Sequence, residues 1–432
     1  MNHVVDKDAK KKFLFVSWES LSGDLAWQIK KEGHEVKIYI KETTDVYDGF
    51  LDKVDDWKAN VDWADVVVFD DVGFGDQADK LRKQGKAVVG GSVYTDRLEE
   101  EREFGQSEMK RLGMLTLSSW DFDNYDVALK FIQENPGRYV YKPSGFVPSD
   151  WKGLLFMGKE EDGKDLYEIL AHNKITLSKK IKQFQLQKFA SGVEVGASRF
   201  FNGQDFVGPI TIGFEHKRLF PGELGPLTGE MGTSIFWCES NYIFRATLEK
   251  MKDDLQKSGY VGYIDINCIV NGRGIYPLEF TCRFGYPFIS IQGEGVLSPW
   301  GEFLHAIANH QPYDLKVKRG FQIGVVIATP PFPYDDKSEV EIYHDSSILF
   351  KKPNIEGVHL GDVKFADGDW RVAGNSGYDL VVTGSGSTME EARKQAYSRI
   401  DNIMLQNMFY RTDIGATWAE DSDKLQTWGY LH

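Results

Sequence analysis

The sequence predicts a multidomain α/β protein, with a parallel sheet near the N-terminus and a mostly antiparallel sheet near the C-terminus. Short apolar segments alternate with helix-like segments from residue 13 to about residue 118, which is typical of strands joined by crossover helices. Two segments of alternating polar and apolar residues flank Asn271-Gly272-Arg273-Gly274, which predicts a β-hairpin. Beyond Pro312 the sequence is rich in strand-like segments. With 432 residues, 41% of them hydrophobic, the chain can form more than one domain core.

The N-terminal segment indicates where a ligand is expected. Ligands of parallel sheets bind beyond the carboxyl ends of the strands. We therefore expect a binding site near residues 17–22 and 70–75. The predicted strands span residues 13–17, 36–40, 65–69 and 87–89, and the predicted helices span residues 23–31 and 76–84.

A further helix is predicted near the C-terminus, where Thr388 begins the capping box TMEE. Its apolar stripe would consist of Met389, Ala392, Ala396 and Ile403. We interpret this stripe as core packing.

Composition limits the classes of partner. The formal net charge of −14 argues against binding to nucleic acid or to an anionic membrane. The three cysteines, Cys238, Cys268 and Cys282, are widely spaced and are expected to be free thiols. The N-terminus lacks a signal-peptide core, and no apolar segment approaches membrane-spanning length. We expect a soluble, cytoplasmic protein, monomeric or a small homo-oligomer, that acts on small molecules.

The hairpin at residues 259–287 is the most informative stretch. Alternation places Asp265 and Asn267 on one face of its first arm and Glu279 and Thr281 on one face of its second arm. A three-residue turn would place Asp265 opposite Glu279. Two facing carboxylates repel each other, and Mg²⁺ would relieve this repulsion because it prefers hard oxygen ligands. The ordinary alternative is a solvated hairpin with scattered charges.

The end of this hairpin, LEFTCRFGYP at residues 278–287, resembles the metal-binding signature of the ATP-grasp ligases. It is most similar to the pattern EFNCRFGDPE of the glycinamide ribonucleotide synthetase (phosphoribosylamine–glycine ligase) family, from which Thr281, Tyr286 and Phe288 depart. Further segments that resemble that family include LAWQI at residues 25–29, RYVYKPSG at 138–145, LQKFASGVEVGASRFFNG at 186–203, FEHKRLFPGELGPLTGEMGT at 214–233 and NMFYRTDIG at 407–415.

The resemblance covers nearly the whole chain and implies an ATP-grasp fold in three parts. Residues 1–118 would form an N-terminal α/β (pre-ATP-grasp) domain. Residues 119–312 would form the ATP-grasp domain, with a small lid at about residues 138–215. Residues 313–432 would form a C-terminal β-rich domain.

The resemblance also implies roles for individual residues. The ligands of Mg²⁺ or Mn²⁺ would be Glu279, Asp265, Asn267 and Thr281. The ATP-binding residues would be Arg102, Lys142, Lys152, Lys188, Phe189, Ala190 and Glu194. The catalytic residues would be Arg283, Lys217 and Arg218. The substrate-contacting residues, most of them in one Gly/Pro-rich loop, would be Thr228, Gly229, Glu230, Met231, Gly232 and Tyr286.

Each of these residues also has an ordinary structural interpretation. Arg102 could be one charge on a solvated helix, Lys142 an exposed strand lysine and Glu194 a strand-end carboxylate. The segment at residues 214–233 could be a surface loop. The joint occurrence of this segment and the metal-binding hairpin favours the functional interpretation.

The implied reaction is the ATP-dependent joining of a carboxylate and an amine through an acyl phosphate. The turn at residues 17–22 departs from the family, because SWESLSGD replaces the glycine-rich GSGGREHA and introduces Glu19 and Asp24. Side chains and negative charge there disfavour a phosphate. We therefore expect a ligase with altered substrates. The alternatives are a genuine glycinamide ribonucleotide synthetase of purine biosynthesis, a kinase-like or phosphatase-like derivative, and an ATP-binding module without activity.

Overall fold

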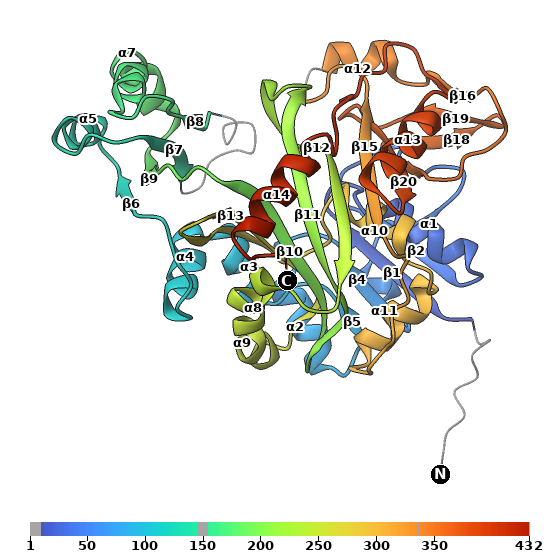
Figure 1. The fold of residues 1–432 in the computed structure, drawn as a ribbon. Helices are drawn as coiled ribbons and strands as arrows, with labels where there is room; N and C mark the ends of the chain where they lie inside the picture. Colours follow the sequence, from blue (N-terminus) through green and yellow to red (C-terminus); the bar gives the residue numbers. More distant parts are fainter. Residues whose placement is uncertain (1–9, 145–153, 335–336, 432) are drawn as a thin grey trace.

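The computed structural model describes residues 10–144, 154–334 and 337–431, and these residues form four β-sheets with helices packed around them (Figure 1). The first sheet is parallel throughout and has the strand order β3-β2-β1-β4-β5. Its strands are β1 (Lys12–Ser17), β2 (Glu35–Ile40), β3 (Asp52–Lys53), β4 (Val66–Phe69) and β5 (Val88–Val89). Helices α1 (Gly23–Lys31), α2 (Gly75–Lys83), α3 (Val93–Glu100) and α4 (Arg102–Arg111) accompany it. The predicted parallel sheet is thereby confirmed.

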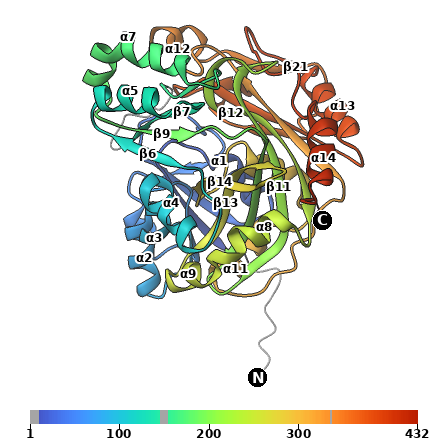
Figure 2. The same ribbon diagram turned by 60° about the vertical axis from the view of Figure 1, so that its left-hand side comes forward.

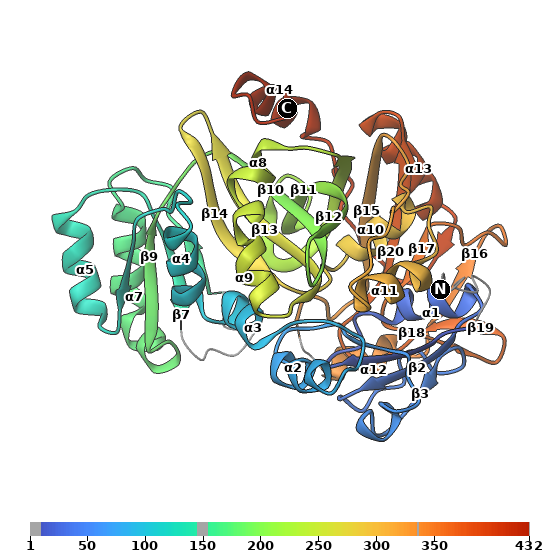
Figure 3. The same cartoon turned by 90° about the horizontal axis from the view of Figure 1, so that it is seen from below.

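A small antiparallel sheet with two helices stands apart from the rest of the molecule, at the left of Figures 1 and 3. Its strands are β6 (Ser119–Phe122), β9 (Gln183–Lys188), β7 (Tyr139–Ser144) and β8 (Phe156–Met157), in this order across the sheet. Its helices are α5 (Tyr125–Glu134) and α7 (Lys164–Lys180). Buried aromatic and leucine side chains join the helices to the sheet, among them Tyr125, Tyr141 and Phe184. We call this unit, from β6 to β9, the lid; the lid expected at about residues 138–215 also included β10 (Val193–Asn202) and part of β11 (Phe206–Phe220), which lie in the central eight-stranded sheet.

The central sheet has eight strands in the order β14-β13-β10-β11-β12-β15-β20-β17, and all of its pairings are antiparallel. Five strands come from the middle of the chain: β10 (Val193–Asn202), β11 (Phe206–Phe220), β12 (Leu224–Cys238), β13 (Val261–Asn271) and β14 (Gly274–Thr281). Three come from its C-terminal part: β15 (Phe321–Ala328), β17 (Val358–Leu360) and β20 (Tyr378–Gly386). The C-terminal strands therefore continue the central sheet, and the division of the chain at residues 118 and 312 stays a proposal.

Helices cover both faces of the central sheet. Gly324 faces Ile291 of helix α10 (Phe288–Gly295), whereas Gly384 faces Ala396 of helix α13 (Met389–Ile400) from the other side. Helix α11 (Trp300–Ala308) packs near β10 and β13, and helix α14 (Trp418–Thr427) crosses the same strands (Figures 1 and 2).

The remaining short elements are α8 (Tyr242–Ala246), α9 (Lys252–Lys257), α12 (Lys337–Tyr343) and the sheet of β18 (Val363–Ala366), β19 (Asp369–Val372), β16 (Ser347–Phe350) and β21 (Ile403–Met404). No described helix is long and apolar enough to cross a membrane. The three cysteines are free thiols, as expected.

Two local expectations were wrong. The stretch at residues 214–233, expected to be a loop, lies in β11 and β12, with only a short turn between them. Gly232 approaches the carbonyl of Gly324 on β15, so the small residues of this stretch serve close strand pairing. Helix α13 begins at the predicted capping box of Thr388 but ends before Ile403, which lies in β21.

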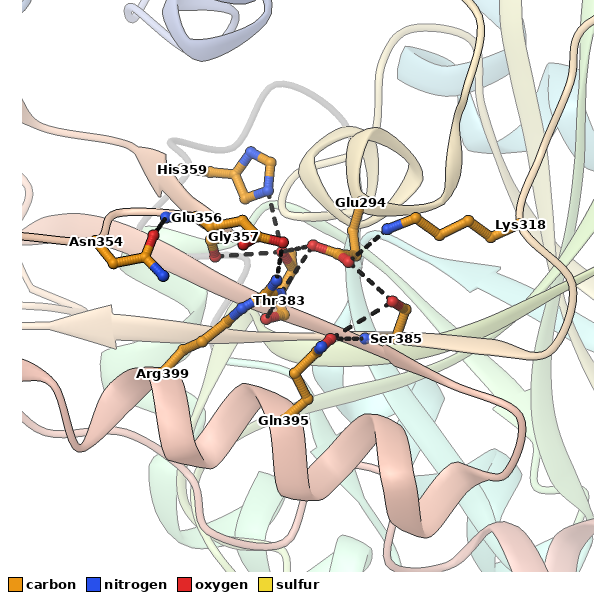
Figure 4. Close-up of polar contacts among 10 residues, drawn as sticks. All are labelled: Glu294, Lys318, Asn354, Glu356, Gly357, His359, Thr383, Ser385, Gln395 and Arg399. Atoms are coloured by element: carbon orange, nitrogen blue, oxygen red, sulfur yellow. Dashed lines mark hydrogen bonds and ion pairs between the residues drawn. The ribbon is translucent and has the colours of Figure 1, made fainter.

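A buried polar network connects helix α10 to the C-terminal strands (Figure 4). The Glu294 carboxylate lies 2.9 Å from both the Arg399 guanidinium and the Lys318 ammonium. It also accepts hydrogen bonds from the hydroxyl groups of Thr383 and Ser385. Because α10 follows the hairpin of β13 and β14 in the chain, this network connects the hairpin to the C-terminal part of the sheet.

The mutation Glu294→Gln should lower the free energy of unfolding by about 3 kcal/mol at pH 7, because two cations lose their buried partner. Burial opposes ionisation of Glu294, but Lys318 and Arg399 outweigh it and lower its pKa. In the wild type, the stabilisation by ionised Glu294 is fully present above the ordinary glutamate pKa and is lost as the pH falls through the lowered pKa. The difference in stability between wild type and mutant should therefore disappear at low pH. Urea unfolding of wild type and mutant at pH 7 and below pH 4 measures the difference.

The matched control is Glu356→Gln, because Glu356 also lies 2.9 Å from Arg399 but is 72% exposed. It should cost less than about 1 kcal/mol. Equal stability of the two mutants would show that the buried network is not what holds this junction.

Candidate active site

The hairpin of β13 and β14 presents four polar side chains on one face. Asp265 pairs with Thr281 and Asn267 pairs with Glu279, and directly opposed residues of an antiparallel pair share a face. The pairing of Asp265 with Glu279 that a three-residue turn would give does not occur. Asn271 pairs with Gly274 across a two-residue turn, and a bulge between Asn267 and Cys268 then shifts the register.

Lys217 of β11 lies at the centre of the acidic residues on this face. Its ammonium is 3.2 Å from both Glu194 Oε1 and Glu215 Oε2 and 3.5 Å from Glu279 Oε1. Burial disfavours its charge, but these carboxylates outweigh burial and hold its pKa well above the usual value. The charge of Lys217 in turn lowers the pKa of Glu279 to about 2. Glu279 is therefore ionised at neutral pH.

Acidic side chains outnumber this lysine. We define the carboxylate cluster as Glu194, Glu215, Glu230, Asp265 and Glu279. Burial, followed by the charge of Glu215, raises the pKa of both Asp265 and Glu230 well above the usual range. Asp265 and Glu230 therefore favour their protonated forms, and a bound cation would favour the ionised forms.

The arrangement fits a hard divalent cation. Among the described residues, Asp265 Oδ2 and Asn267 Oδ1 are buried and have no hydrogen-bond partner. Asn267 donates its amide to Glu194 Oε1 at 2.8 Å, so its amide oxygen is left for another ligand. A Cβ on Gly196 would lie 3.1 Å from Asp265 Oδ2, so the missing side chain leaves space there. In residues 10–144, 154–334 and 337–431, no three His, Cys, Asp or Glu side chains form a complete metal site by themselves.

Two basic residues approach the carboxylate cluster from other elements. Lys142 is buried on β7 of the lid, and Arg102 begins helix α4. Burial and the charge of Arg102 lower the pKa of Lys142 to about 8, although Glu279 and Glu194 act in the opposite direction. Lys142 therefore faces both the basic and the acidic groups of the site. Lys152 lies outside the described residues.

The strand end at Lys188, Phe189 and Ala190 follows β9. The Lys188 N–H donates to the carbonyl of Ser118 at 2.8 Å, and the Phe189 N–H donates to that of Arg138 at 2.9 Å. The Arg138 guanidinium stacks over the Phe189 ring at 3.4 Å. A nucleotide base bound here would have to use the other backbone groups of this segment.

Arg283 connects the hairpin to the N-terminal sheet. Its Nε lies 3.1 Å from Glu99 Oε1 and 3.2 Å from Asp71 Oδ1. Burial disfavours its charge, but Glu99 and Asp71 outweigh burial and raise its pKa. Nearby, the Tyr286 hydroxyl donates to the carbonyl of Asp70 at 3.4 Å. Sequence reasoning missed Glu99, which belongs to no motif, whereas Asp71 lies in the stretch at residues 70–75 where a ligand was expected.

The segment at residues 214–233 contributes to the site and to its support. Lys217 contacts Glu215 of the carboxylate cluster, and Glu230 of the same cluster accepts a hydrogen bond from Thr233. Arg218 instead donates to the carbonyl of Gly225 at 2.7 Å, across the hairpin of β11 and β12. Thr228 donates to the carbonyl of Lys217 at 2.9 Å. The exposed Gly229 and the buried Met231 and Gly232 lie on β12.

Comparison with known proteins assigns this arrangement to a family. The model of the phosphoribosylglycinamide synthetase ATP-grasp (A) domain matches residues 100–288, and the model of the C domain of that synthetase matches residues 322–417. Together they cover well over half of the chain. The chain belongs to the phosphoribosylglycinamide synthetase family. It is an ATP-grasp ligase that forms C–N bonds, which confirms that the protein is an enzyme.

Similar proteins support this assignment. A phosphoribosylamine–glycine ligase of Streptococcus suis is 25% identical over 78% of this chain and 80% of its own length. One of Leptospira interrogans is 26% identical over 79% of this chain and 80% of its own length. The solved structure of a Thermotoga maritima phosphoribosylamine–glycine ligase has a TM-score of 0.68 at 21% identity, covering 93% of this chain and 100% of that chain. A Campylobacter jejuni biotin carboxylase, which covers 98% of each chain, has a TM-score of 0.62 at 12% identity. The last two likenesses show the shared fold.

The synthetase motif NMFYRTDIG at residues 407–415 supports the β11–β12 hairpin. Arg411 is buried, with its guanidinium 2.7 Å from Glu223 and 2.8 Å from Asp413. The Gly222 N–H donates to Asp413, and the Gly415 N–H donates to His216. Arg411 was not singled out from the sequence, although it is the largest buried charged residue of the fold.

The N-terminal turn of this synthetase-like chain holds a carboxylate of its own. Ser22, just before helix α1, donates its N–H and its hydroxyl to Asp70 Oδ2, at 3.2 and 2.5 Å. The buried Tyr47 hydroxyl donates to the carbonyl of Ser20. Burial and the charge of Asp71 raise the pKa of Asp70 to about 7. The N–H and hydroxyl groups of Ser22, at the start of helix α1, are thus already bound to an acidic side chain.

Proposed function

We propose that this protein is an ATP- and Mg²⁺-dependent phosphoribosylamine–glycine ligase that forms glycinamide ribonucleotide for purine biosynthesis. The observation that carries the proposal is the match of relatives with that activity over 78–79% of the chain. The sequence favoured altered substrates, and the comparisons support the unaltered pair better.

The basic residues and the acidic residues of the site would bind different groups. Lys142 and Arg102 would bind phosphate oxygens of ATP, since both are cations at the edge of the carboxylate cluster. Asp265, Asn267 and Glu279, with Thr281 opposite Asp265, would hold the divalent cation. When bound, such a cation reduces the charge repulsion between ATP phosphates and an attacking carboxylate.

Lys217 and Arg283 would position groups on either side of the reacting atoms. Lys217 keeps Glu194, Glu215 and Glu279 close together despite their repulsion. Arg283, with its planar fork of donors, is suited to a carboxylate or an acyl phosphate. The glycine carboxylate would attack the γ-phosphorus of ATP, which forms an acyl phosphate and releases ADP. The amine nitrogen would then attack the acyl carbon, and inorganic phosphate and a proton would leave. Glu194 would bind the ribose hydroxyls of ATP.

The test is product formation by the purified protein. With ATP, Mg²⁺, glycine and phosphoribosylamine generated in the assay, we expect glycinamide ribonucleotide and ADP in equal amounts, measured by mass spectrometry. Omission of either substrate should abolish the product. Absence of glycinamide ribonucleotide, together with an amide formed from another amine and acid, would overturn the substrate assignment.

A second candidate is a ligase for an amine without a phosphate group. It is favoured by Asp70, whose carboxylate occupies the N–H and hydroxyl groups of Ser22 that could otherwise bind an anion. Competition among pools of amines and amino acids, with phosphoribosylamine and glycine included, distinguishes the two candidates.

A further inference from the structure

A tryptophan and a lysine are stacked at the carboxyl end of the N-terminal sheet. The Trp18 ring is parallel to that of Phe74, with centroids 4.1 Å apart and an angle of 13° between the planes. Its indole N–H donates to the carbonyl of Val72 at 2.9 Å. The Lys41 ammonium lies 4.0 Å from the Trp18 ring centroid. Since Phe74 covers one face of the indole, Lys41 occupies the other.

This stack borders the candidate active site. Trp18 follows β1 and Lys41 follows β2, and these strands are parallel neighbours whose carboxyl ends meet at one edge. The Lys41 N–H donates to the carbonyl of Ser17 at 3.0 Å, which places Lys41 next to the N-terminal turn. Val72, to which Trp18 is bonded, follows Asp71, the partner of Arg283.

The chemistry of the turn requires a cation from outside it. A phosphate at the start of helix α1 would have to displace Asp70 from Ser22 and would meet the charge of Asp70 itself. Asp24 is also engaged there, 2.7 Å from His359. Lys41 is an exposed ammonium beside this turn, and its contact with Trp18 restricts an otherwise flexible side chain.

We propose that Lys41, held over Trp18, binds the phosphate of the amine substrate in place of the backbone N–H groups of the turn. Trp18 is then a positioning residue that holds the Lys41 ammonium at the carboxyl end of the N-terminal sheet. The inference rests on the proposed function, because it gives phosphoribosylamine a phosphate site that the turn does not offer.

The first test is steady-state kinetics of the full-length protein. Lys41→Met should raise the KM for phosphoribosylamine about tenfold or more, the usual effect of losing a charged hydrogen bond, and leave the KM values for ATP and glycine within about twofold. Lys41→Arg should restore most of the affinity. The matched control is Lys31→Met, because the Lys31 ammonium also lies 4.0 Å from a ring, that of Trp27, but at the C-terminal end of helix α1. Equal KM values for phosphoribosylamine in Lys41→Met and Lys31→Met would overturn the proposal.

The second test separates this inference from the proposed function. Wild type should bind ribose 5-phosphate more tightly than ribose in calorimetry, and Lys41→Met should remove most of that difference. If wild type forms no glycinamide ribonucleotide, the proposed function fails, while this comparison still decides whether Lys41 binds phosphate. An unchanged preference for ribose 5-phosphate in Lys41→Met would reject the role of Lys41, whatever the reaction.

Discussion

Replacing Glu279 with glutamine should lower ATP-dependent turnover on the order of a hundredfold, the scale of several kcal/mol of lost metal electrostatics. The amide keeps the shape of the side chain but removes its charge. The pKa of Glu279, held at about 2 mainly by Lys217, leaves the wild-type group fully ionised at neutral pH. Its pairing with Asn267, beside Asp265, makes it part of the face that fits a cation.

ADP release measured against Mg²⁺ concentration tests this expectation. Because the mutation weakens metal binding, high Mg²⁺ should restore part of the activity of Glu279→Gln. The control is Glu420→Gln on helix α14, whose exposed carboxylate pairs only with Lys424 among the described residues and should not affect turnover. Wild-type activity of Glu279→Gln at subsaturating Mg²⁺ would remove Glu279 from the metal site.

Local patterns predicted the fold class and most of the N-terminal sheet. Strand β4 is apolar throughout and buried, and helix α2 follows it, just as α1 follows β1 and α3 follows β5. The hairpin of β13 and β14 was also predicted, because a turn between two alternating segments is a local signal. Its register could not be predicted, since a bulge adds a residue without changing the sequence pattern.

The sequence could not reveal contacts between residues that lie far apart along the chain. Glu99 lies 184 positions before Arg283, yet it accepts hydrogen bonds from both the Arg283 side chain and the Cys282 N–H. Arg411 and Glu223 are likewise brought together only by the folded sheet. The Gly/Pro-rich composition of β12 suggested a loop. Its small residues instead allow close pairing with β15, and composition alone does not reveal such a pairing.

For a related reason, the sequence could not show that the C-terminal strands join the central sheet. Each strand of β15, β17 and β20 is recognisable by its apolar residues, but the identity of its neighbour depends on the topology. A strand-rich C-terminal segment is equally compatible with a separate sheet and with an extension of an existing one.

Replacing Lys142 with methionine should raise the KM for ATP between about tenfold and a hundredfold, the range expected for a lost charged hydrogen bond. Methionine preserves much of the buried volume on β7 but cannot attract phosphate. The control is Lys130→Met on helix α5 of the lid, whose ammonium is 73% exposed and pairs with Glu134. Lys142→Arg keeps the charge and should lose less affinity.

The pH dependence makes this prediction specific to the charge of Lys142. Only the protonated amine attracts phosphate, and burial together with Arg102 lowers its pKa to about 8. The wild-type KM for ATP should therefore be level below pH 8 and rise above it, by at most about tenfold per pH unit for one titrating group. In Lys142→Arg the KM should stay level through the same range, because arginine remains charged. A rise of equal size in both proteins would assign the titration to another group and leave Lys142 without a role in binding phosphate.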